Sequence, residues 1–172
     1  LHLGAGFANE GNRLEDFDQD EAFAELLSQL TAESLEHNRP LELIFAGDTF
    51  EFLQVPALDA REAFEPAREY PPARYAPSDE ASSRRKMDLI IRGHPLFFKA
   101  LRDLLQHPEC SVCFIKGNHD VNLHWRQVRA LIGAALGAGQ APGRLTFEER
   151  CVSREGLYIE HGNQYLEWVN RW

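Results

Sequence analysis

Three short apolar runs, each followed by a polar loop, restrict the fold of this chain more than any other feature. The runs are LELIFA at 41–46, SVCFI at 111–115 and LYI at 157–159. Their length and their content of β-branched and aromatic residues are typical of buried strands. Segments with helical periodicity lie between them. Strands that alternate with helices predict an α/β layered fold.

The helical segments are recognised by apolar residues spaced three or four positions apart. They are predicted over 18–36, 87–106 and 121–136, with Pro95 starting or kinking part of the second. The first helix carries an apolar face of Phe23, Leu26, Leu27, Leu30 and Leu35. Further short strands are predicted over 145–147 and 150–152.

The segment 54–85 has no apolar periodicity. Five of the nine prolines in the chain lie between Pro56 and Pro77. Such a composition predicts a long surface excursion with too little burial to offset its ordering cost. We expect residues 56–85 to be the most mobile part of the chain, either a lid beside the loop at Asp48 or a flexible insertion.

The charge balance argues against a nucleic-acid partner. Asp and Glu number 27 against 18 Lys and Arg, a formal charge of -9. An acidic surface repels phosphate backbones, and 84–86 (Arg-Arg-Lys) is only a short basic patch. No apolar run approaches about 20 residues, so we expect no membrane span. The start of the sequence lacks the pattern of a signal peptide.

The cysteines indicate a reducing compartment. Three is an odd and low number, which argues against a disulfide framework and favours the cytoplasm. Cys110 and Cys113 have the spacing of a metal-binding pair. They lie in an apolar, β-rich run with no second pair, so buried strand cysteines are the preferred interpretation over a zinc ribbon.

Polar side chains with metal-binding capacity stand where the apolar runs end. Asp48, Asn118 and His161 each follow such a run, and His2 stands near the beginning of the sequence. Sites in α/β sheets lie beyond the carboxyl ends of the strands, so these four side chains can converge. This mixture of oxygen and nitrogen ligands suits two divalent transition metals, Mn, Fe, Zn or Co, rather than a thiolate site.

Such a site has a defined chemistry. Asp48 can bridge two cations with its two oxygens, and a metal pair stabilises the attacking and leaving oxygens of a displacement at phosphorus. His119 can neutralise the leaving group while Asp120 holds its imidazole. Taken alone, each motif also fits a turn or an ordinary surface histidine. Their common position at strand ends favours a site.

The motifs resemble those of the calcineurin-like metallophosphoesterases. The family pattern runs D-x-H, GD, GNH-D/E, a lone His and GH-x-H. The matching segments are HLG at 2–4, GDTFE at 47–51, GNHD at 117–120 and EHGN at 160–163. The resemblance implies a single domain over 1–172, a two-sheet β-sandwich flanked by helices with metals at the strand ends. It also implies a domain truncated at both ends, because the first Asp would precede Leu1 and GH-x-H would follow Trp172.

The resemblance also implies roles for the individual residues. His2 ligates the first metal, Asp48 bridges both, and Asn118 and His161 ligate the second. His119 is the catalytic acid or transition-state stabiliser, with Asp120 orienting it; Glu51 matches a common acidic position, with no role assigned.

The expected activity is hydrolysis of a phosphomonoester or phosphodiester on a small substrate through a metal-bridging hydroxide. A non-catalytic scaffold and a nuclease branch of the same fold are the alternatives, and the oligomeric state stays open.

Overall fold

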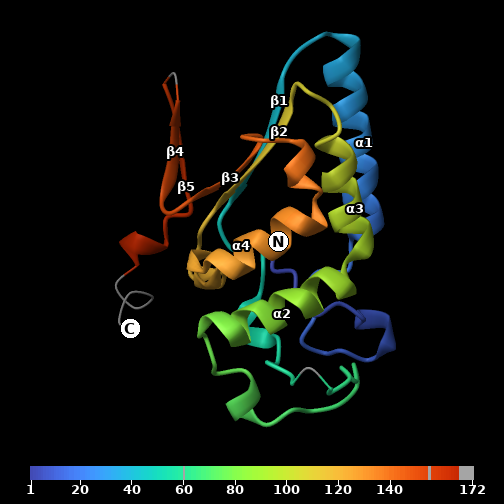
Figure 1. Ribbon diagram of the computed structural model, residues 1–172, viewed down its shortest axis with the longest axis vertical. Helices are drawn as coiled ribbons and strands as arrows, with labels where there is room; N and C mark the ends of the chain where they lie inside the picture. The colour runs from blue at the N-terminus through green and yellow to red at the C-terminus, as the bar shows by residue number, and fades with distance from the viewer. Residues whose placement is uncertain (60, 155, 167–172) are drawn as a thin grey trace.

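The computed structural model describes residues 1–59, 61–154 and 156–166 (Figure 1). Its strands fall into a three-stranded sheet and a separate two-stranded hairpin. The α-helices are α1 (Asp20–Glu36), α2 (Glu80–Gly93), α3 (Pro95–Leu104) and α4 (Arg126–Ala135). The strands are β1 (Leu41–Ala46), β2 (Cys110–Ile115), β3 (Leu145–Glu148), β4 (Cys151–Arg154) and β5 (Leu157–Glu160).

The larger sheet is parallel, with the strand order β1-β2-β3. Phe114 of β2 is paired with Phe45 on one side and with Phe147 on the other. Their rings stack across the three strands, with centroids 4.7 and 5.6 Å apart. Because side chains alternate along a strand, this aromatic row places one face of all three strands in the main core.

The two faces of the sheet are covered by different elements (Figure 1). Helices α1 and α3 pack together on the aromatic face, where Phe23 and Phe97 stack with centroids 4.5 Å apart. On the other face, Ile44, Cys113 and Ile115 pack against Val152 and Ile159 of the antiparallel β4–β5 hairpin. The sheet is therefore buried on both sides, as expected for parallel strands.

The predicted α/β class is confirmed. The more specific prediction of a two-sheet β-sandwich flanked by helices is not shown by the described strands. They form one small parallel sheet and one hairpin. The strands over 41–46, 111–115, 145–147, 150–152 and 157–159 agree with the structure to within two residues at each end.

The helix predictions are partly confirmed. The segment 121–136 is not one helix, because a 3-10 turn, η4 (Val121–His124), ends at an extended Trp125 before α4 begins. The helical segment 87–106 is confirmed, with Pro95 starting its second part as α3, while its first part, α2, begins earlier than predicted, at Glu80. On α1, Leu26 and Leu35 are exposed, so the apolar face is narrower than its sequence indicates.

The segment 54–85 is less separate from the core than its composition predicts. Val55, Leu58 and Tyr70 are buried in the main core. Its last residues belong to α2, which begins at Glu80 because the Asp79 side chain accepts a hydrogen bond from Ser82 N. A few apolar side chains within the proline-rich segment therefore attach it to the core, although its sequence has no apolar periodicity.

Two further expectations concern the cysteines and the membrane. Cys110 and Cys113 are buried strand residues, as predicted, and all three cysteines are free. Burial raises the pKa of the Cys113 thiol. Within the described ranges, the helices are too short or too polar to cross a bilayer.

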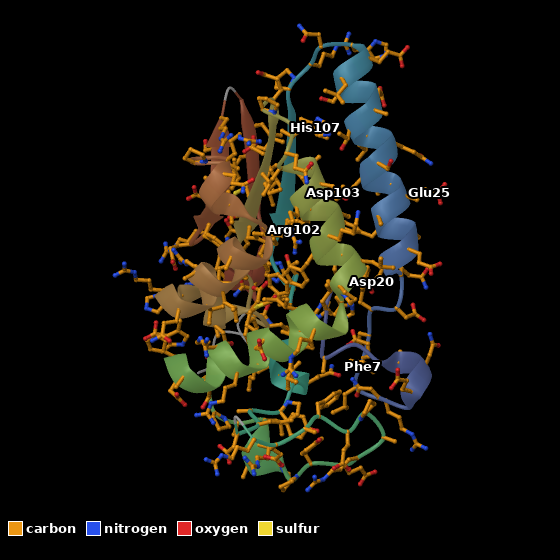
Figure 2. All side chains as sticks on the ribbon, turned by 45° about the vertical axis from the view of Figure 1, so that its right-hand side comes forward. Phe7, Asp20, Glu25, Arg102, Asp103 and His107 are labelled. Carbon is orange, nitrogen blue, oxygen red and sulfur yellow. The ribbon has the colours of Figure 1, made fainter. Side chains whose placement is uncertain are left out.

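A buried charged cluster joins the N-terminal loop to the start of α3. His94 is 1% exposed, and its Nδ1 contacts Asp20 Oδ2 at 2.8 Å. Its Nε2 lies 3.4 Å from Glu15 Oε1, at ion-pair distance but without hydrogen-bond geometry. Asp20 stands at the first turn of α1, facing the start of α3 (Figure 2). Burial alone would lower the pKa of His94, but the contacts with Asp20 and Glu15 outweigh it and raise the pKa to about 9.

This cluster predicts a pH-dependent stability. A histidine with a folded-state pKa above its unfolded value of about 6.5 stabilises the fold fully below pH 6.5, and the contribution is lost as pH rises through 9. At about 1.4 kcal/mol per tenfold change in proton affinity, it is on the order of 3 kcal/mol. We expect Asp20→Asn to lower the free energy of unfolding at pH 6.5, and this deficit to shrink towards pH 9.5.

The measurement is urea unfolding of metal-free protein between pH 6 and 9.5. Glu25→Gln, an exposed substitution on the same helix, is the control and should run parallel to the wild type. A deficit for Asp20→Asn that is independent of pH would contradict the assignment of a charged His94.

Candidate metal centre

The candidate site lies at the carboxyl ends of β1, β2 and β5. Gly47 and Asp48 follow β1, residues 116–120 follow β2, and His161 follows β5. The first residues of the chain run beside the loop after β1, with His2 N donating to Asp48 O at 3.0 Å and Leu3 N to Thr49 O at 2.9 Å. All four sequence-predicted metal ligands are thereby brought to one place, as the strand-end pattern predicts.

The backbone around Asp48 is held in an uncommon conformation. Asp48 and His2 have positive φ values of 48° and 61°, which non-glycine residues seldom adopt. Gly117 crosses so close that a Cβ on it would lie 2.1 Å from Asp48 Oδ1. Likewise, a Cβ on Gly47 would lie 2.4 Å from the His161 ring. Strained conformations and close approaches of this kind cluster at functional sites.

On one side of Asp48, three electron-pair donors face one another. His161 Nε2 lies 3.1 Å from Asp48 Oδ2 and 3.1 Å from Asn118 Oδ1. His161 Nδ1 contacts the carbonyl of Ala46 at 2.9 Å, and a carbonyl only accepts, so Nδ1 carries the hydrogen. His161 Nε2 therefore faces two oxygens. It can meet them as the N–H donor of an imidazolium, or as the lone pair of a neutral ring with a cation among the three atoms.

On the other side, two imidazoles share one carboxylate. His2 Nδ1 and His119 Nδ1 contact Glu51 Oε2 at 2.8 and 2.6 Å, and their rings meet edge to face at 4.8 Å. The Glu51 side chain is 1% exposed. A carboxylate accepts from both Nδ1–H groups, which leaves each Nε2 as the free donor atom. Histidines that ligate metals are held by a carboxylate or carbonyl in this way.

The donor set fits metal binding. Metal–donor distances of about 2.0–2.2 Å leave neighbouring donors roughly 3.0–3.4 Å apart, which the contacts around His161 match. Ligand atoms of His2, Asp48 and His119 also lie within 4.8 Å of one another. Asp48 Oδ2 stands between the two halves, 3.9 Å from His2 Nε2. His119 thus lies beside His2 and Asp48, so its ring is near enough to join them as a ligand, although the sequence predicted a catalytic role for it.

Asp120 has a different role from the one predicted. Its Oδ2 accepts from the backbone N–H groups of Thr49 and Phe50 at 2.8 and 3.4 Å, and its Oδ1 accepts from Gly117 N at 2.7 Å. The residue is fully buried, and burial raises its pKa although the three N–H groups act in the opposite direction. Its carboxylate ties the loops after β1 and β2 together, and Glu51 is the group that contacts the His119 ring.

Glu51 is thus the residue that sequence reasoning noticed without a role. Its position three residues after Asp48 is the only local signal. The contact with His2 and His119 joins residues 49 and 68 positions away in sequence. Only the fold reveals that one buried carboxylate serves both rings.

In comparisons with known proteins, no family model, curated protein or solved structure matches this chain. The resemblance to calcineurin-like metallophosphoesterases rests on the sequence motifs alone.

Gly117→Ala tests the close approach of the two loops. The added Cβ cannot coexist with Asp48 Oδ1 at 2.1 Å, so the carboxylate must move away from His161. We expect Mn²⁺ affinity, measured by calorimetry, to fall at least ~10-fold. Gly139→Ala is the control, because nothing lies within 4 Å of a Cβ there. Equal affinities for the two variants would argue against Asp48 as a ligand.

Glu51→Gln tests the shared carboxylate. The substitution keeps the shape but removes the charge that accepts both Nδ1–H groups, so both imidazoles lose orientation. We expect a loss of ~10–100-fold in Mn²⁺ affinity in the same assay. Glu33→Gln, on the exposed face of α1, should leave the affinity unchanged. Unaltered binding by Glu51→Gln would mean that the two histidines are not held for a metal.

Proposed function

We propose that this protein is a metal-dependent phosphoesterase of the calcineurin-like class, acting on a small phosphomonoester or phosphodiester. The observation that carries the proposal is the Asp48 carboxylate, which stands between two groups of donor atoms at the carboxyl end of a parallel sheet. One aspartate flanked in this manner suits a pair of cations better than a single one.

The metals would be divalent transition ions, Mn, Fe, Zn or Co. His2 and Asp48 would hold one, and Asp48, Asn118 and His161 the other. When bound, such ions act as Lewis acids on phosphoryl oxygens and lower the pKa of water. The two-sheet sandwich of the family belongs to this proposal as well.

His119 would handle the proton. Glu51 holds its Nδ1–H, so Nε2 is the atom that remains for the substrate. In the imidazolium form, Nε2 would donate to the oxygen of the leaving alcohol. Because Glu51 is 1% exposed, water does not compete for this contact.

Space for the rest of a substrate lies next to the site. A cavity of about 720 Å³ runs along Gly117, which precedes Asn118, and Glu160, which precedes His161. Lys116, Arg150, Tyr158 and Tyr165 also line it. This volume suits a small organic phosphate.

Two alternatives are separable from the phosphoesterase. A nuclease is disfavoured by the charge of -9. Lys86 is also buried, which reduces the short basic patch at 84–86 to Arg84 and Arg85. A scaffold would need neither the carboxylate that orients His119 nor the convergent donors. The three free thiols suit a reducing cytoplasm, which is where we place the activity.

The test is Mn²⁺-dependent hydrolysis of p-nitrophenyl phosphate and bis-p-nitrophenyl phosphate, with single-stranded DNA and RNA alongside. We expect turnover of a nitrophenyl ester, and loss of both metal and nearly all turnover in Asp48→Asn. Asp88→Asn, which removes an exposed partner of Arg92 on α2, is the matched control.

Full turnover and unchanged metal content in Asp48→Asn would refute the assignment. A wild type that binds metal and hydrolyses nothing would favour the scaffold, and faster hydrolysis of nucleic acid than of the small esters would favour the nuclease branch.

A further inference from the structure

Helix α2 lies against three of the segments that carry the candidate site. It crosses below the carboxyl end of the parallel sheet, between the sheet and the segment 54–79 (Figure 1). Its buried face includes Ser83, Lys86 and Ile90, which are spaced by three or four residues. Two of these three are polar, which is unusual for a buried stripe and calls for partners.

Lys86 has its partners in the backbone. The residue is 2% exposed, and its Nζ donates to Phe52 O at 3.0 Å and to Tyr75 O at 2.6 Å. Phe52 directly follows Glu51, the carboxylate that holds His2 and His119. Lys86 thus fixes the peptide next to Glu51 and ties it to the end of the proline-rich segment.

The Lys86 ammonium makes no ion pair within the described ranges, although it is buried. Burial lowers its pKa to about 8, and the negative charges of Asp79 and Glu51 oppose that change. The fold therefore keeps a costly charge in place for two carbonyl contacts. A position that served only packing would be filled more stably by an apolar side chain.

One turn earlier on α2, Ser83 contacts the segment that follows β2, which carries Asn118 and His119. Ser83 Oγ accepts from Asn122 Nδ2 at 2.7 Å, and both residues are buried. Asn122 lies two residues after Asp120, in the turn that continues the loop of Asn118 and His119.

The end of the same helix meets the first segment of the chain. A Cβ on Gly93 would lie 2.0 Å from Ala5 O, so the two backbones touch. Ala5 lies three residues after His2. Along its length, α2 therefore contacts the segments of His2, of Asp48 and Glu51, and of Asn118 and His119.

We propose that Lys86 and Ser83 are positioning residues: from the buried face of α2 they fix the loops that carry Glu51 and His119, and so set the geometry of the candidate metal centre. This inference rests on the proposed function for its effect on catalysis. Neither side chain touches the donor atoms, so both act through the loops.

The test compares Lys86→Met, which keeps the length and removes the ammonium, with Lys99→Met, an exposed position on α3. In Lys86→Met we expect Mn²⁺ affinity to fall ~10–100-fold and kcat to fall with KM within about twofold, because the site is displaced and the substrate cavity is not. The electron paramagnetic resonance spectrum of bound Mn²⁺ should broaden as well. Lys99→Met should match the wild type in every readout.

Ser83→Ala is the second variant, because it removes one hydroxyl and keeps the helix even where Lys86→Met does not fold. It should lower kcat in the same direction with KM unchanged. Wild-type affinity, kcat and spectrum in Ser83→Ala and in any folded Lys86→Met would overturn the inference.

Amide hydrogen exchange separates this inference from the proposed function. Faster exchange at 49–53 in Lys86→Met, with β2 amides unchanged, would show that Lys86 fixes the loop of Glu51, even if the wild type bound no Mn²⁺ and hydrolysed nothing. That second result would refute the proposed function alone. Unchanged exchange at 49–53 together with unchanged kcat in a catalytically active protein would refute the positioning role alone.

Discussion

The parallel register of β1 and β2 is the constraint on which the candidate site depends. Ala46 is paired with Ile115, so both strands end at the same level and their loops leave the sheet side by side. Gly117 then meets Asp48 at a distance that only a glycine allows. The Asp120 carboxylate closes the junction by accepting N–H groups from both loops. A shift of one residue in this register would separate Asp48 from Asn118, and their donor atoms would no longer meet at His161.

Much of this arrangement could be predicted from the sequence. Short apolar runs identify the strands, and the rule that sites lie beyond the carboxyl ends of strands predicts the meeting of Asp48, Asn118 and His161. The helix α1 was predictable because its periodicity is local. These features depend on residues that are close in sequence or on a general property of parallel sheets.

Other features depend on contacts that no local pattern encodes. The first half of α2 is mostly polar and follows a proline-rich stretch, so its sequence is typical of a solvent-exposed segment. Ser83 and Lys86 are nevertheless buried, by elements far away in sequence. Asp120 is next to His119 in sequence, but its carboxylate accepts a hydrogen bond from Thr49 N in the loop after β1. The His119 ring is instead contacted by Glu51, which comes from that loop. Both acidic residues were noted in the sequence, but only the tertiary fold determines which group each carboxylate contacts.

The central claim is that donor atoms on both sides of Asp48 form one metal centre. Anomalous diffraction from crystals of the protein grown with Mn²⁺ tests it most directly. We expect two Mn²⁺ peaks about 3.5–4 Å apart, both bonded to Asp48, with His2 on one and with Asn118 and His161 on the other. A Mn²⁺ peak without Asp48 in its coordination shell, or Asp48 still in contact with His161 at saturating Mn²⁺, would contradict the claim.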